Sequence, residues 1–319
     1  MVGLIMGLNS KNFMKRNQLI VGNWRSLLKH GTGGRMTLRI LTLLMLLPSV
    51  VSLGGCSYFS SDDATASTTV ADPPGQLYAQ ADAAMSDGKF STAAKKFEEV
   101  DREHPYSPFA RRAIVMAAFS HFKNGAYNDA IKAGRRYTTL HPGTKEASLA
   151  HHVIASSYFE QIKDPARDQR ITKAALKELE ILVRRYPDSE YAKTARNRIR
   201  ISRDVLAAAE MNVGRYYLRR SNYLAAVNRF KKVVTDYQTT SQVEEALMRL
   251  TETYMALGIR HEAQTAAAVL GHNFPNSKWY KDAYELLASD GLAPRASSGS
   301  WLTKAWKGTV NSVSSLNPF

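Results

Sequence analysis

The chain has 319 residues, of which 44% are apolar and 22% are charged, and this composition excludes a membrane-embedded helix bundle. The length is ample for one large soluble domain or two small ones. The formal net charge is +15, but residues 1–55 contain seven basic and no acidic side chains, which leaves +8 for the remainder. No basic run is interleaved with aromatic residues, so the sequence gives nucleic acid little support as a partner.

Cys56 is the only cysteine, and this excludes an intramolecular disulfide. It follows an apolar run over residues 40–53 that is preceded by Arg39 and closed by two glycines. A run of this length is short for a transmembrane helix and is typical of a signal peptide. Leu53-Gly54-Gly55-Cys56 matches the bacterial lipobox, in which the cysteine thiol takes a diacylglycerol. The alternative is an ordinary signal sequence followed by an unmodified cysteine.

We therefore predict a lipoprotein signal peptide over residues 36–55 and lipidation of Cys56 by fatty-acyl chains such as palmitate. Translation is expected to begin at Met36, with residues 1–35 an over-extended N-terminus. Several acyl chains hold a protein on a membrane stably, whereas one would be marginal. By analogy with other bacterial lipoproteins, in which an aspartate after the cysteine tends to retain the protein in the inner membrane, Ser57 favours the outer membrane. Residues 56–74 are rich in Ser, Thr, Ala and Asp and indicate a flexible tether.

From residue 75 to residue 289 the pattern is helical, and it repeats. An aromatic or histidine residue, usually followed by proline, closes each unit, and a serine or threonine follows at a fixed offset. The five boundaries are His104-Pro105, His141-Pro142, Tyr186-Pro187, Tyr237-Gln238 and Phe274-Pro275. Proline stops one helix and the hydroxyl is expected to cap the next.

Small residues at fixed offsets and a turn glycine in most units match the tetratricopeptide repeat. The sequence therefore predicts an all-α superhelix of five helix pairs, about ten helices. The expected units are residues 75–107, 108–144, 145–189, 190–240 and 241–277, with a closing helix to residue 289.

Two units depart from the pattern. In the third, a loop over residues 163–170 replaces the tight turn. In the fourth, the first helix is expected to run from about Tyr191 to Arg220, and Ser221-Asn222 replaces the turn glycine. After them, residues 290–319 form a low-complexity tail in which Trp301 and Trp306 could share a short amphipathic helix. This helix would face a partner or a membrane, or it would pack back on the last repeat.

No catalytic motif, phosphate-binding loop or metal-ligand spacing survives inspection. His151 and His152 are adjacent, so they point about 100° apart on a helix and cannot chelate one ion together. The sequence therefore predicts a binding protein with no enzymatic activity, catalytic residue, metal or cofactor.

In such an array the first helix of each pair lines a concave groove. The side chains expected there are Tyr78, Asp82, Met85, Arg112, Val115, Phe119, Phe122, His152, Ser156 and Phe159. Of these we single out Tyr78, Arg112, Phe119, Phe122 and Phe159 as a groove for an extended peptide that carries aromatic side chains and a carboxylate. The alternative is that several of them face the helix of the next unit.

The lipobox, the tether and five repeats with an expanded third unit resemble the BamD family of outer-membrane protein assembly factors, also called ComL-type lipoproteins, and its alphaproteobacterial members in particular. The resemblance covers roughly residues 36–289. It is sharpest in Arg167-Asp168-Gln169 with Thr172 and Ala175, in the segments 184–189 and 210–217, and in the segments 225–230 and 237–240.

The resemblance implies a non-catalytic lipoprotein subunit of the β-barrel assembly (Bam) complex, lipid-anchored on the periplasmic face of the outer membrane. Its repeat groove would receive the C-terminal targeting segments of unfolded outer-membrane proteins. Its C-terminal repeats would bind the periplasmic domains of the BamA-like barrel subunit, with Arg229 as the contact candidate, beside other Bam lipoproteins.

Two alternatives remain open. One is a periplasmic repeat protein that coordinates cell division or envelope maintenance, although no heptad run precedes residue 77. The other is a peptidoglycan-active enzyme, for which no nucleophile or carboxylate pair stands out.

Overall fold

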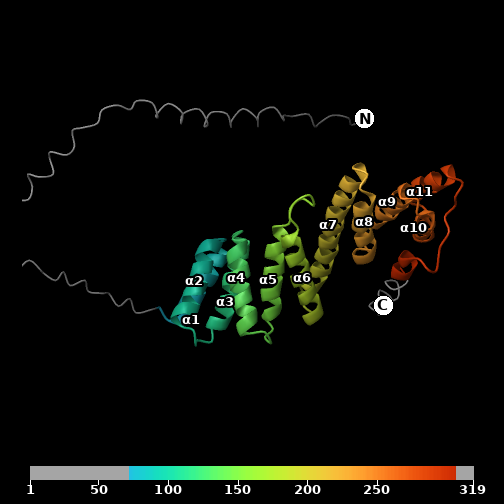
Figure 1. Cartoon of the computed structure of the whole chain (residues 1–319). Helices are drawn as coiled ribbons and strands as arrows, with labels where there is room; N and C mark the ends of the chain where they lie inside the picture. Colours follow the sequence, from blue (N-terminus) through green and yellow to red (C-terminus); the bar gives the residue numbers. More distant parts are fainter. Residues whose placement is uncertain (1–71, 307–319) are drawn as a thin grey trace, which may run out of the picture. The chain divides into compact units, whose positions relative to one another are not determined.

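The computed structural model describes residues 72–306, and this part of the chain is helical with no strand. Its helices are α1 (Pro74–Ser86), α2 (Phe90–Glu103), α3 (Ala110–Lys123), α4 (Tyr127–Leu140), α5 (Ala147–Glu160), α6 (Arg170–Arg185), α7 (Ala192–Arg219), α8 (Tyr223–Asp236), α9 (Val243–Ala256), α10 (Arg260–Asn273) and α11 (Lys278–Ser289) (Figure 1). A helical turn follows over residues 301–306. Cys56, the predicted signal peptide and most of the predicted tether lie outside the described residues.

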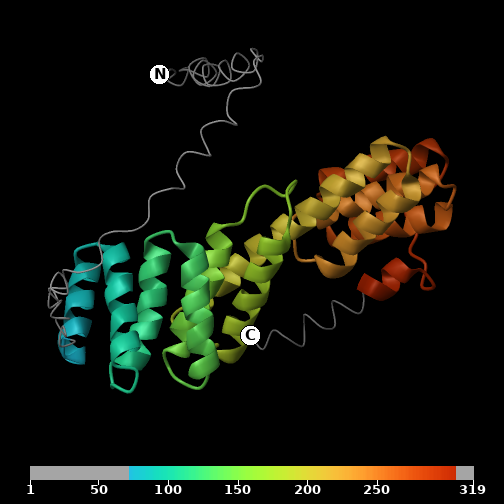
Figure 2. The ribbon, with the colours of Figure 1, turned by 60° about the vertical axis from the view of Figure 1, so that its left-hand side comes forward.

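Each helix packs against the next one along the chain, so the helices lie side by side in sequence order (Figures 1 and 2). Contacts also join α3 to α5 and α9 to α11, as expected when the first helices of successive pairs are neighbours. The predicted all-α fold of five helix pairs is confirmed, and α11 covers the exposed side of the fifth pair. None of the helices in residues 72–306 is long and apolar enough to cross a membrane.

The turn inside most pairs depends on a left-handed backbone conformation. Gly88, Gly125 and Gly258 have φ of 73° or 74°, where a glycine pays no steric cost. In the fourth pair Ser221 takes this position with φ of 56°, and it is the one non-glycine residue with positive φ in the described part of the chain. The serine therefore substitutes for the turn glycine at a steric cost.

The joins between pairs share one geometry. The residues that close α2, α4, α6, α8 and α10 all have φ between −130° and −136°. Three residues further on, the backbone N–H of a serine or threonine donates to the carbonyl of that closing residue, as in Ser107 to His104 at 2.9 Å. Each join is therefore a tight turn.

The hydroxyl groups at these joins do not all act as the sequence suggested. Ser107 accepts from the first N–H of α3 at 3.1 Å, and Ser277 accepts from the N–H of Trp279 at 3.2 Å, so both cap the following helix. The hydroxyls of Thr144, Ser189 and Thr240 instead donate back to the carbonyl that closes the preceding helix. The capping prediction is therefore wrong at these three joins, where the hydroxyl reinforces the turn.

Gln169 organises the long loop of the third pair. Its amide nitrogen donates to the carbonyls of Asp164, Pro165 and Arg167, at 2.8 to 3.3 Å. Its amide oxygen accepts from the hydroxyl of Thr172 at 2.8 Å. A single side chain thus ties the backbone of the loop to the first turn of α6.

α7 has 28 residues, which corresponds to a length of about 42 Å. Its first half packs against α6 through Ala195, and its second half packs against α8 through Met211. A Cβ atom on Gly214 would lie 2.5 Å from the ring of Phe230, so a glycine is required for α8 to approach this closely. α7 is the first helix of the fourth pair, and its extra length lets it pack against the third pair as well as against its own partner α8.

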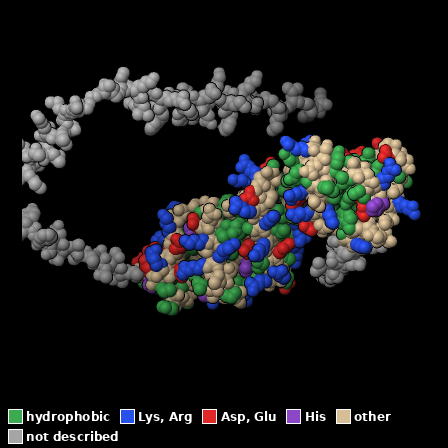
Figure 3. Space-filling view, viewed as in Figure 1, with side chains coloured by type: hydrophobic (Ala, Val, Ile, Leu, Met, Phe, Trp, Pro, Cys, Tyr) green, Lys and Arg blue, Asp and Glu red, His purple; other side chains and the backbone are tan. Residues whose placement is uncertain are grey.

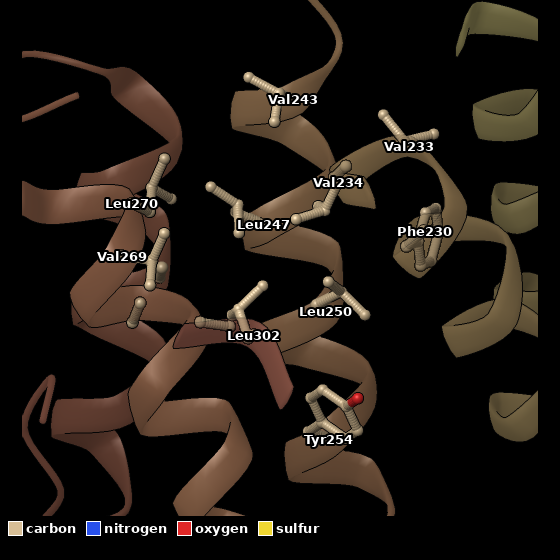
Figure 4. Close-up of a cluster of buried hydrophobic side chains, with 14 of the residues drawn as sticks. Phe230, Val233, Val234, Val243, Leu247, Leu250, Tyr254, Val269, Leu270 and Leu302 are labelled. Atoms are coloured by element: carbon tan, nitrogen blue, oxygen red, sulfur yellow. The ribbon is translucent and has the colours of Figure 1, made fainter. Parts of the chain in front are cut away.

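The core differs along the array. From the second half of α7 to residue 302, the buried apolar side chains form one continuous cluster (Figure 4). In α1 to α6, with the first half of α7, they form separate smaller clusters.

Candidate binding surfaces

Tyr78, on α1, belongs to the wall of the first pair. Its ring lies 5.3 Å from that of Phe97 and 5.5 Å from that of Phe109, between ring centroids. Burial raises the pKa of the Tyr78 hydroxyl, and the nearby positive charge of Arg112 partly opposes this. The structure therefore brings Tyr78 and the exposed Arg112 close together, with the tyrosine half-buried.

Phe119 and Phe122 lie one turn apart on α3 and are half-buried. Both pack against the buried cluster of Ala118, Ala130 and Val153, which joins α3, α4 and α5. The ammonium nitrogen of Lys123 lies 5.5 Å from the centre of the Phe119 ring. Each ring is thus held by the core with part of its surface open, and a cation lies beside Phe119.

Phe159, on α5, lies under an arginine that sequence reasoning missed. The guanidinium carbon of Arg198, on α7, lies 4.8 Å from the centre of the Phe159 ring. Arg198 also donates to the hydroxyl of Ser156 at 2.6 Å and to the carboxylate of Glu160 at 3.3 Å. The arginine is therefore fixed by two polar partners while it covers one face of the phenylalanine.

His152, one turn before Ser156, faces the same arginine. Its ring stacks on that of Tyr191 with a centroid distance of 4.4 Å. Burial lowers the pKa of His152 to about 4, and the positive charge of Arg198 contributes to the shift. The imidazole is therefore neutral at neutral pH, beside the positive charge of Arg198.

Some of the expected groove residues lie elsewhere. Val115 is buried in the cluster shared with Tyr137 and Ala150, so its assignment to the groove is wrong. Ser156 is also fully buried and is used to hold Arg198. Val115 packs inward because α3 contacts α2, α4 and α5. These contacts cover more of the surface of α3 than its own pair partner alone would cover.

Arg229, the candidate on the C-terminal pairs, is held by an acidic neighbour. It donates to one oxygen of Glu210 at 3.0 Å, while Lys232 donates to the other at 2.5 Å. Burial alone would raise the pKa of Glu210, but the hydrogen bonds from Lys232 and Arg229 outweigh it and the pKa is lowered. The carboxylate is therefore ionised, and Arg229 keeps 42% of its side chain exposed.

A cavity of about 540 Å³ lies beside this cluster. Its lining on α7 includes the apolar side chains of Leu206 and Val213 beside the carboxylate of Glu210. Its rim is basic, because Arg167 from the long loop, Lys173 from α6 and Arg229 from α8 surround it. This combination suits an acidic loop that inserts an apolar side chain.

The face shown in Figure 3 carries basic and acidic side chains interspersed over the N-terminal helices, and hydrophobic side chains gather over the C-terminal ones. Recognition on this face therefore depends on local contacts rather than on a field of one sign. Within residues 72–306 there is no group of three His, Cys, Asp or Glu side chains that could hold a metal ion.

The fold defines a tetratricopeptide-type scaffold of consecutive helix pairs. A family model described as YfiO, outer membrane lipoprotein, matches residues 70–270. The outer membrane protein assembly factor BamD of Caulobacter vibrioides is 44% identical over 218 residues, which cover 68% of this chain and 72% of that protein. The BamD of Rickettsia prowazekii is 35% identical over 249 residues, covering 78% and 96%.

The chain therefore belongs to the BamD (YfiO) family of outer membrane lipoproteins, and it is an assembly factor for outer membrane proteins. Among solved structures, the TPR2AB domain of yeast Sti1 aligns with 68% of this chain and 84% of its own length, at 13% identity and a TM-score of 0.39.

Proposed function

We propose that the chain is the repeat subunit of the Bam complex that receives unfolded outer-membrane proteins and presents them to a BamA-like barrel subunit. It acts without catalysis, beside other Bam lipoproteins, from the periplasmic face of the outer membrane, where acylated Cys56 anchors it. The observation that carries the proposal is the pairing of aromatic rings with cations on α3, α5 and α7.

The N-terminal surface suits a chain end that is both aromatic and anionic. Phe119, Phe122 and Phe159 offer half-buried ring surface, while Arg112 and Lys123 offer positive charge. An extended segment gains affinity from both, because stacking on a ring and pairing with a cation are independent contacts. The surface is therefore expected to favour an extended, unfolded segment over a folded one.

Crosslinking to a peptide with the C-terminal sequence of a barrel protein tests this surface. The double variant Phe119→Ala, Phe122→Ala should reduce crosslinking at least about tenfold, since two aromatic contacts of about 1 kcal/mol each are lost. Leu140→Ala removes an exposed apolar side chain from the last position of α4 and is the matched control. Unchanged crosslinking of the folded double variant would remove the groove assignment.

The C-terminal surface at Arg229 is proposed to hold a periplasmic domain of the BamA-like subunit. The basic rim of the neighbouring cavity and the exposed part of Arg229 suit an acidic loop of that domain. Arg229→Glu should reduce co-purification strongly, because it reverses the charge and adds a carboxylate beside Glu210. Arg229→Ala should reduce it less, and Arg260→Glu, at an exposed cation on α10, should leave it unchanged. Normal recovery with Arg229→Glu would refute the contact.

The function as a whole is tested by depletion. Loss of the protein should lower the folded levels of outer-membrane barrel proteins, and restoration with Cys56→Ser should fail because the chain leaves the membrane fraction. Normal barrel levels after depletion would instead favour the cell-division and envelope role.

A further inference from the structure

The chain beyond α11 returns across the last pair (Figure 1). The side-chain amide of Gln264 donates to the carbonyl of Ala293 at 2.8 Å, and the N–H of Arg295 donates to the backbone carbonyl of Gln264 at 3.2 Å. Residues 300–306, named here the tail segment, then form one helical turn against α8, α9 and α10. These two hydrogen bonds hold the chain against α10 just before the tail segment begins.

Each early residue of the tail segment has a distinct partner. Leu302 is fully buried and lies beside Leu250 (Figure 4). The indole N–H of Trp301 donates to the hydroxyl of Tyr254 at 3.0 Å, and the ammonium of Lys231 lies 4.5 Å from the centre of the indole. The hydroxyl of Ser300 donates to Glu262 at 2.6 Å.

Ser300 also starts the helical turn, because its hydroxyl oxygen accepts from the N–H of Leu302 at 3.1 Å. The tail segment therefore has the sequence of a small recognition motif: a capping hydroxyl, an aromatic ring with a polar edge, and an apolar anchor. A single helical turn is not stable in water, so packing against α8, α9 and α10 must stabilise the turn of the tail segment.

The tail segment binds in a trough that recurs along the array. Each trough lies between the second helices of two neighbouring pairs, and the first helix between them forms its floor. In the α8/α10 trough the floor is Leu247, Leu250 and Tyr254, and the same repeat positions on α3 are Ile114, Ala117 and His121. Those three residues line a cavity of about 780 Å³ between α2 and α4.

The equivalent trough between α6 and α8 contains the 540 Å³ cavity described above, floored by Glu210, Val213 and Tyr217 at the same repeat positions. In the trough between α4 and α6, side chains of the array itself meet, since Arg135 of α4 donates to the hydroxyl of Tyr158 of α5 at 2.9 Å. The α8/α10 trough is therefore the member of this set that a segment from elsewhere in the chain fills.

We propose that the α8/α10 trough is a peptide-binding site for a short helical turn of the type hydroxyl-Trp-Leu, and that the tail segment is its built-in occupant, exchangeable for a partner segment of the same chemistry. The connector of residues 290–299 sets the strength of the competition. A short flexible connector gives an effective concentration of about 1 mM, and the hydrogen bonds that hold Ala293 and Arg295 on α10 make this a lower bound, so the tail excludes weak ligands and yields to strong ones. The inference does not rest on the proposed Bam function.

The test uses the full chain and a fluorescent peptide of residues 297–306. Trp301→Ala, Leu302→Ala empties the trough in cis, and this double variant should bind the peptide about tenfold more tightly than the unaltered chain if the peptide Kd is about 0.1 mM. Adding Lys231→Ala or Glu262→Gln to the double variant should weaken binding again. Asp129→Asn, at the repeat position of Glu262 in the α2/α4 trough, is the matched control.

A double variant with native helicity that does not bind the peptide would overturn the proposal, and the tail would then be a fixed cap. A second measurement decides the matter if the double variant unfolds. Excess unlabelled peptide added to the ¹⁵N-labelled unaltered chain should speed hydrogen exchange at the amides of Leu302 and Lys304 and leave those of α9 unchanged. Exchange at these two amides that does not respond to the peptide would equally refute exchange of the tail.

Discussion

The two ends of the array bury their apolar residues in different ways. From the second half of α7 through α11 to Leu302, one cluster runs without interruption. In the N-terminal pairs the clusters are small and separate, and half-buried aromatic rings lie between them and the surface. In a repeat array, stability is a sum of unit and interface terms, so a continuous cluster unfolds as one body while separate clusters open one pair at a time. The N-terminal pairs are therefore the more adaptable region.

Polar groups explain much of this difference. In the troughs of the N-terminal pairs, Arg136 pairs with the buried Asp101, and His151 lies 3.5 Å from Glu178. In the α8/α10 trough, Leu247 takes the repeat position of His151, and it belongs to the same buried cluster as Leu302 of the tail. Replacing charged pairs by packed apolar side chains extends the core across neighbouring pairs.

The largest expected effect comes from a matched pair of phenylalanines. Phe97 and Phe230 are fully buried and stand seven residues before the ends of their repeats at His104 and Tyr237. Truncation to alanine should cost about 3–5 kcal/mol at either position, because each leaves a large cavity. Phe230→Ala should lower the urea midpoint of the whole C-terminal body, whereas Phe97→Ala should open α1 and α2 and spare the rest.

Hydrogen exchange separates the two outcomes. With Phe97→Ala, only the amides of α1 to α3 should exchange faster, and with Phe230→Ala those of α8 to α11 should do so together. Equal, global acceleration in both variants would show that the array is one cooperative body and would remove the contrast between its ends.

A smaller effect is expected on the pH dependence of stability, and it arises from His152 in the region of α5 and α7. The pKa of His152 is lowered to about 4, below the ordinary value of 6.5, by burial and by Arg198, while Glu190 opposes the shift. Between these two values the unfolded chain binds the additional proton, so stability is complete above pH 6.5 and falls as the pH drops towards 4. The loss is about 2 kcal/mol once the part of the ring open to water is allowed for.

His152→Phe keeps the stack on Tyr191 and removes the titration. The variant and the unaltered chain should therefore differ in the slope of unfolding free energy against pH between 4 and 6.5, and only in the transition that reports on α5 and α7. Parallel slopes would mean that the imidazole is protonated without cost in the folded chain.

The helix pairs follow from local signals, and the sequence therefore predicts them well. Proline after an aromatic residue ends a helix wherever it occurs, and the three turn glycines adopt the conformation that glycine alone takes without strain. At Ser221 the repeat position predicts the left-handed turn even though a serine, and not a glycine, occupies it.

The features that escaped sequence reasoning depend on contacts between distant segments. Arg198 covers Phe159 because the first half of α7 lies beside α5, and no spacing within either helix encodes this. The basic residues early in α7 were the available signal. The direction of the tail was open for the same reason, because Trp301 and Trp306 suit a membrane, a partner or the Tyr254 hydroxyl equally well until α8, α9 and α10 are placed.

The smallest expected effect tests the turn of the fourth pair. A left-handed conformation costs a serine about 1 kcal/mol, and the larger freedom of glycine in the unfolded chain offsets about half of this. Ser221→Gly should therefore raise the unfolding free energy by about 0.5 kcal/mol, measured by urea denaturation. Because the turn belongs to the continuous C-terminal cluster, the gain should appear in the transition of α8 to α11.

The reverse substitutions give the comparison between the two ends. Gly258→Ser and Gly88→Ser introduce the same strain at the same repeat position, with φ of 74° and 73°. Gly258→Ser should lower the midpoint of the whole C-terminal body, whereas Gly88→Ser should lower only that of α1 and α2. If the two variants shift one common unfolding transition by the same amount, the two ends of the array are coupled through α7 and unfold as a single cooperative unit.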